Sequence, residues 1–90
     1  DYSKAIEIDP NDSNAFERRG SAKGSLGDYK GAIGDLLKAV EIDPNKSTSY
    51  FYLGLAKYHL RDNKGACEDW KKAADLGYEE AAELLKEHCE

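Results

Sequence analysis

The chain has 90 residues, of which 34% are charged, and a formal net charge of −5 at pH 7. A chain of this length forms one small domain with a modest core, which leaves little room for a deep enzyme cleft. Its acidic balance argues against a nucleic-acid or anionic-lipid partner, and no apolar run approaches the ~20 residues of a membrane span.

The first predicted element is the end of a helix at residues 1–8, followed by a stop at Pro10. Proline lacks the amide donor and moves the preceding residue out of the helical region. Residues 11–13, Asn-Asp-Ser, then offer side chains that can cap the next helix. The apolar side chains of the first helix are Tyr2, Ala5 and Ile6.

Residues 14–26 and 29–42 form the next two predicted helices. Gly27 supplies the left-handed residue that ends the first of them, and Asp28 is the N-cap of the second. A connection this short joins antiparallel helices. The sequence Asp43-Pro44-Asn45 ends the hairpin.

A second hairpin follows at residues 49–60 and 64–76, with Asp62 as its internal cap, and residues 79–88 form a last helix. Arg61 stands where the first hairpin has Gly27, so we expect the second turn to be less tight. Alanines 5, 39 and 73 lie 34 residues apart within similar flanking sequences, and this period is typical of helical-hairpin arrays.

These patterns resemble the tetratricopeptide repeat family. One repeat carries Phe16, Gly20, Leu26, Gly27, Asp28, Tyr29, Ala32, Leu36, Ala39, Asp43, Pro44 and Asn45. The next carries Tyr50, Leu53, Gly54, Ala56, Leu60, Asp62, Ala66, Trp70 and Ala73. The resemblance implies an all-α, right-handed superhelical α-solenoid of antiparallel hairpins. We divide the chain into the end of a preceding repeat (1–10), two repeats (13–46 and 47–80) and a capping helix (79–89).

Three departures from the family pattern are basic residues. Lys23 and Lys57 stand where the family usually has an aromatic residue, and Arg19 replaces the usual leucine. We expect the stems of Arg19 and Lys23 to cover apolar surface.

Members of this family mostly bind peptides or partner helices on the concave surface of the first helix of each hairpin. That resemblance and the positions at which the two repeats differ predict a partner-binding set. Its members are Asn14, Glu17, Arg18, Ser21, Thr48, Phe51, Tyr52, Leu55, Tyr58 and His59.

Phe51, Leu55 and Tyr58 form a second apolar stripe on the helix at 49–60, and a helix that is apolar on all sides is either buried or carries a binding face. We expect this stripe to face the groove, with Gly24 beside Tyr58 leaving a notch for a partner side chain. In the alternative reading, Phe51 and Leu55 pack against the neighbouring helices.

Some family members hold the C-terminal carboxylate of heat-shock chaperones in a clamp of lysines, asparagines and an arginine. At the matching positions this chain has one cation, Arg18, and Glu17 would repel a carboxylate. We therefore do not expect chaperone-tail binding. A different alternative is a structural segment that self-associates through the unpaired helix at residues 1–8.

No nucleophile–base–orienter set, phosphate loop or metal-ligand spacing is recognisable, so we expect no enzyme activity, cofactor or metal. Cys67 and Cys89 match no zinc or redox motif, and we interpret them as reduced thiols of a cytoplasmic protein. A disulfide between them is the alternative, which no feature of the sequence supports. No signal peptide is visible, although the chain opens in mid-pattern, which leaves room for an upstream segment.

Overall fold

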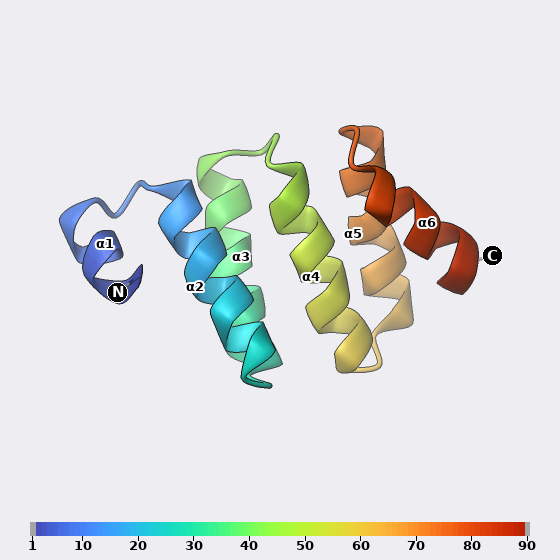
Figure 1. The fold of residues 1–90 in the computed structure, drawn as a ribbon, viewed down its shortest axis with the longest axis horizontal. Coiled ribbons are helices and arrows are strands. Elements are labelled where there is room, and N and C mark those ends of the chain that lie inside the picture. Colours follow the sequence, from blue (N-terminus) through green and yellow to red (C-terminus); the bar gives the residue numbers. More distant parts are fainter. Residues whose placement is uncertain (1, 90) are drawn as a thin grey trace.

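A computed structural model describes residues 2–89, and in it six α-helices follow one another. They are α1 (Tyr2–Ile8), α2 (Ser13–Ser25), α3 (Tyr29–Ile42), α4 (Ser47–His59), α5 (Asn63–Asp75) and α6 (Glu79–His88). Helices α2, α4 and α6 lie in one layer and α3 and α5 lie behind them (Figure 1). The predicted all-α solenoid of antiparallel hairpins is confirmed. No helix within residues 2–89 has the length and apolar character needed to cross a membrane.

Helices α2, α4 and α5 begin one or two residues earlier than predicted and end one residue earlier. Asp12, rather than a later residue, caps α2 by accepting hydrogen bonds from the amides of Asn14 and Ala15. Asp28 and Asp62 cap α3 and α5 as predicted, each accepting a hydrogen bond from the amide three residues on.

The second interhelical turn is as tight as the first, so the prediction of a looser turn is wrong. Arg61 adopts a left-handed conformation with φ of 66°, as Gly27 does with φ of 86°. In both turns the amide of the capping aspartate donates to the lysine carbonyl five residues before it, at 2.9 Å. The hydrogen bonds of the turn therefore outweigh the local cost of about 1–2 kcal/mol for a non-glycine residue in this conformation.

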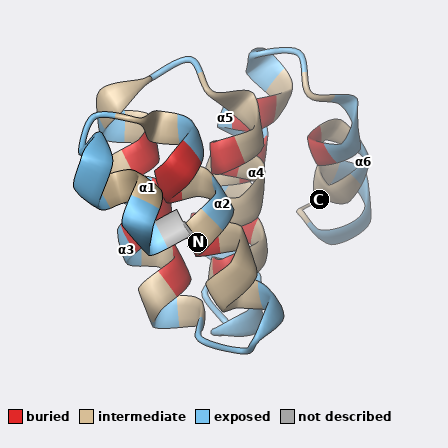
Figure 2. Cartoon of the chain, turned by 60° about the vertical axis from the view of Figure 1, so that its left-hand side comes forward, coloured by how far each residue is buried: buried red, intermediate tan, exposed pale blue. Residues whose placement is uncertain are grey.

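The core lies between the helices, where buried residues face one another, while turns and outer faces are exposed (Figure 2). Small residues let the helices approach closely. A Cβ atom on Gly54 would collide with the indole of Trp70, and one on Gly20 would lie 2.8 Å from Cγ of Leu36. The indole is 1% exposed, and its Nε1 donates to the carbonyl of Phe51 at 3.3 Å.

The three basic residues that depart from the family pattern pair with an aspartate on the second helix of their own hairpin. Arg19 donates to Asp35 through Nε (2.8 Å) and Nη2 (2.7 Å), and Lys23 Nζ lies 3.1 Å from the same carboxylate. In the second repeat Lys57 Nζ lies 2.8 Å from Oδ2 of Asp69. Ion pairs between the two helices of each hairpin thus replace part of the apolar contact that the family pattern leads one to expect.

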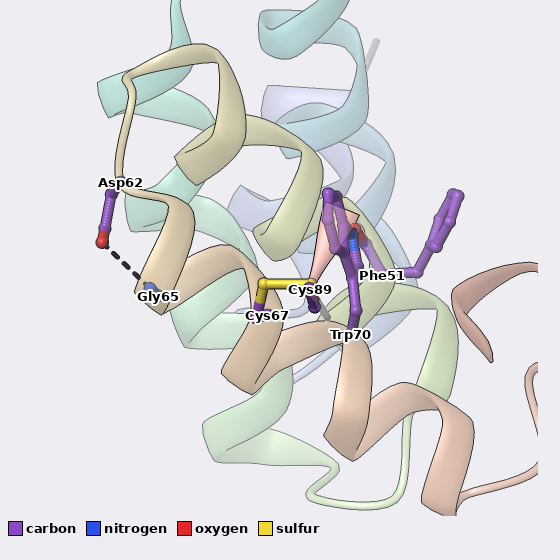
Figure 3. The surroundings of a disulfide bond; sticks show 6 residues. All are labelled: Phe51, Asp62, Gly65, Cys67, Trp70 and Cys89. Carbon is purple, nitrogen blue, oxygen red and sulfur yellow. Dashed lines mark hydrogen bonds between the residues drawn. A yellow bond between two sulfur atoms is a disulfide. The ribbon is translucent and has the colours of Figure 1, made fainter. Parts of the chain in front are cut away.

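The structure joins Cys67 and Cys89 in a disulfide, with their Cα atoms 5.9 Å apart, so the interpretation as reduced thiols is wrong (Figure 3). Cys67 lies within α5, and Cys89 is the C-cap of α6. Because α6 folds back along α5, two residues 22 positions apart meet. No local spacing rule predicts such a pair, since a disulfide depends on Cα geometry in the folded chain.

Candidate functional site

A cavity of about 190 Å³ lies between α2 and α4, with α3 as its floor. The two helices that flank it touch only marginally, whereas α3 packs extensively against both. Its lining consists of Gly20, Ser21, Gly24, Ser25, Tyr29, Ala32, Leu36, Tyr52, Leu55, Ala56 and His59. Ser25 and His59 at its edge are exposed, so the cavity opens to solvent.

The α2 wall of the cavity is built from glycine and serine at positions that face α4. The floor is apolar, with Ala32 and Leu36 each 1% exposed. The ring of Tyr29 stacks on that of His59, with centroids 4.7 Å apart and an interplanar angle of 7°. This stack ties the start of α3 to the end of α4 and forms one end of the cavity lining.

Four of the predicted partner-binding residues line the cavity together: Ser21, Tyr52, Leu55 and His59. Tyr58 does not. Its ring lies 5.8 Å from Trp70 and 5.0 Å from His88, among α4, α5 and α6. The notch at Gly24 therefore exists, but it is bounded by the other α4 residues and not by Tyr58. Tyr29 was missed as a lining residue because it lies on the second helix of its hairpin, whereas the prediction considered only the first helices.

Asn14, Glu17 and Thr48 belong to a polar contact between α2 and the first turn of α4. Oε2 of Glu17 accepts hydrogen bonds from the hydroxyls of Thr48 and the fully buried Ser49, each at 2.6 Å. Lys46 donates through Nζ to Oδ1 of Asn14. These bonds fix the spacing of the two helices at the end of the groove opposite His59.

Phe51 is half-buried, with its ring 4.9 Å from Tyr78 and 5.7 Å from Tyr52. It packs against the N-cap of α6, and Leu55 packs against the core while also lining the cavity. The pKa of Tyr78 is raised above its ordinary value, mainly because the side chain is partly buried. The nearby side chains of Glu80, Tyr52 and Glu17 add smaller contributions in the same direction. Tyr78 was missed as a neighbour of the groove because it stands in the connection between two helices, at the position that Pro44 has in the first repeat.

Arg18 is exposed on α2 and, within residues 2–89, forms no ion pair. It lies one turn before Ser21 on the same helix, at i and i+3. The described part of the chain has no cluster of three or more histidine, cysteine, aspartate or glutamate side chains that could hold a metal ion. The site is therefore an apolar hollow with a polar edge and a nearby cation, which can hold a side chain of another molecule.

Comparisons with known proteins agree with this architecture. The family model described as TPR repeat matches residues 20–60. No curated protein sequence matches the chain. Solved structures match it closely: the first TPR of Spaghetti (RPAP3) bound to HSP90 peptide SRMEEVD has a TM-score of 0.90 and 25% identity, covering 96% of this chain and 70% of that one.

Two further structures are similar over much of their repeats. YrrB, described as a TPR protein with an unusual peptide-binding site, has a TM-score of 0.89 at 22% identity, and covers 94% of this chain. The complex of the TPR2B domain of yeast Sti1 with pHsp70 has a TM-score of 0.81 at 28% identity, and covers 83% of this chain. This chain spans 45% of the YrrB chain and 60% of the Sti1 chain.

Proposed function

We propose that the chain, as a tetratricopeptide repeat protein, acts as a protein-interaction scaffold that holds a peptide or a helix of a partner against α2 and α4. The observation that carries this proposal is the open cavity between these two helices. Its α2 and α4 walls are built largely from residues that the two repeats do not share, and so from residues that the repeat scaffold does not require.

Relatives of the same fold are solved with an HSP90 peptide and with pHsp70, which supports a peptide as the ligand. The chemistry of this groove favours a different peptide from an acidic chaperone tail. Glu17 keeps its carboxylate at the groove by hydrogen bonds to α4. Within residues 2–89, Arg18 is the one exposed cation among the predicted binding positions.

A random peptide library selected on the immobilised domain tests this proposal. We expect peptides with dissociation constants in the micromolar range, and at least tenfold weaker binding to Ser21→Arg, because an arginine there reaches across the mouth of the cavity. Isothermal calorimetry measures the affinity. The matched control is Gly34→Arg on α3, where an added Cβ meets no atom within 4 Å. Equal binding to all three proteins would refute the groove as the binding site.

We propose self-association through α1 as the second candidate function. Helix α1 packs on α2 with Ala5 and Ile6 half-buried, but Ile8 is 76% exposed. Sedimentation velocity at two concentrations tenfold apart is expected to show a larger species at the higher one, and Ile8→Lys should restore the monomer. A sedimentation coefficient that does not change with concentration would exclude this candidate.

A further inference from the structure

We propose that the cavity between α2 and α4 is an anchor pocket for one aromatic side chain, phenylalanine or tyrosine, of a partner polypeptide. This inference rests on the proposed function and names the residue class that the groove recognises. The two repeats of the chain carry different residues at equivalent positions around this space.

The corresponding space in the second repeat is already filled by an aromatic ring. Gly24 of the first repeat corresponds to Tyr58, 34 residues later. The ring of Tyr58 lies among α4, α5 and α6, in contact with the rings of Trp70 and His88. Between α2 and α4, where the same position is glycine, a cavity remains. The cavity therefore lies where the second repeat holds the larger side chains of Tyr58 and Trp70 in place of Gly24 and Leu36.

The size and lining of the cavity suit an aromatic ring. A dry cavity of about 150 Å³ in another protein holds benzene, and this one has about 190 Å³. Leu36 and Ala32 provide an apolar floor, and the stacked Tyr29 and His59 provide ring faces and edges at its end. Ring pairs contribute beyond the area they bury, through offset or edge-to-face contact. An aromatic guest gains this contact and an aliphatic guest does not.

The charges around the cavity do not define what stands beside the ring in the partner. No carboxylate belongs to the cavity lining. Arg18, exposed and without an ion pair within residues 2–89, lies one turn before Ser21 along α2. Glu17 also lies one turn before Ser21, at i and i+4, and its carboxylate stays at the groove. The two charges near the cavity are opposite in sign, so the aromatic ring, rather than a charge beside it, defines the partner.

The variant Gly24→Tyr tests the inference by copying the second repeat into the first. A Cβ atom on Gly24 meets only Cβ of Ala32, at 3.8 Å, which is ordinary contact. Side chains on a helix lean toward its N-terminus, so the new ring would lie over Gly20 and Ser21 and fill the cavity. Gly34→Tyr is the matched control, because it makes the same change at an open position of α3.

Selected peptides are expected to be enriched in phenylalanine or tyrosine and to bind Gly24→Tyr at least tenfold more weakly than wild type, with Gly34→Tyr unchanged. Peptides that are blocked by Ser21→Arg but bind Gly24→Tyr within twofold of wild type would overturn the anchor pocket and leave the groove function standing. Peptides that bind Ser21→Arg and Gly24→Tyr as tightly as wild type would overturn the proposed peptide-binding function as well.

A second measurement does not depend on the folding of any variant. p-Cresol, the side chain of tyrosine, is titrated into the ¹⁵N-labelled wild-type domain, with isobutanol as the aliphatic comparison. We expect p-cresol to shift the amide signals of Gly24, Leu55 and Ala56 more than signals elsewhere, and isobutanol to shift them at least threefold less. Shifts scattered over the chain, or equal shifts with both probes, would overturn the inference.

Discussion

Replacing both Cys67 and Cys89 with serine is expected to lower the melting temperature by roughly 15 °C. The disulfide closes a segment of 22 residues, and a cross-link over a loop of this length lowers the entropy of the unfolded chain by an amount worth about 3 kcal/mol. For a domain of this size, each kcal/mol corresponds to about 4–8 °C. Differential scanning calorimetry of the oxidised wild type and the double variant measures the change.

Two controls separate the cross-link from other effects of the substitution. Wild type in dithiothreitol should melt near the double variant, since the same bond is missing in both. The loss should also be local, because the disulfide holds the end of α6, where the ring of His88 lies 6.0 Å from Trp70. A change in Trp70 fluorescence on reduction is therefore expected. Oxidised and reduced proteins that melt within 2 °C of each other would contradict the prediction.

Asp35→Asn is expected to destabilise the domain by about 2–3 kcal/mol, whereas Asp69→Asn should leave it equally stable or more stable. Asp35 is buried between two cations, Arg19 and Lys23, and removing its charge leaves both without their partner. Asp69 has one partner, Lys57, among residues 2–89. Urea unfolding at pH 7 measures the free energy of unfolding of both variants. The two substitutions lie 34 residues apart, at equivalent positions of the two hairpins.

The two variants are expected to differ in stability because the pKa values of Asp35 and Asp69 are shifted in opposite directions. Burial is the largest influence on both and opposes ionisation. At Asp35, hydrogen bonds and charges from Arg19 and Lys23 outweigh burial and hold the pKa below its ordinary value. At Asp69, Lys57 offsets burial only in part, and Glu68 and Asp62 add repulsion, so the pKa is raised.

The pH dependence of stability follows from the sign of each shift. With a lowered folded pKa, Asp35 stabilises the fold above its unfolded pKa of about 3.9, and this contribution is lost as the pH falls through the folded value. With a raised folded pKa, Asp69 costs stability as the pH rises from about 3.9 through its folded value. Asp35→Asn should therefore flatten the acid limb of the stability curve. An Asp69→Asn variant less stable than Asp35→Asn at pH 7 would contradict this account.

Much of the fold could be predicted from the sequence because the residues that determine it act on close neighbours along the chain. The 34-residue period, the capping aspartates and the turn glycine act over a few residues, so the helices and their antiparallel pairing could be predicted. The second turn was mispredicted at Arg61, where the hydrogen bonds of the turn overrode the local preference for glycine.

The candidate site was predicted in part for the same reason. Comparing the two repeats identified Ser21, Tyr52, Leu55 and His59, which the structure brings into one cavity. The direction of Tyr58 could not be predicted, because it depends on the rings of Trp70 and His88 from two other helices.

The sequence by itself determined the repeat, its helices and the small residues on the wall of the groove, since each depends on neighbours close along the chain. Only the tertiary structure decided that Cys67 meets Cys89, that Asp35 pairs with both Arg19 and Lys23, and that Tyr58 packs against Trp70 and His88 and not beside Gly24. These outcomes depend on distances between residues from different helices, which the packing of the solenoid sets and no local pattern encodes.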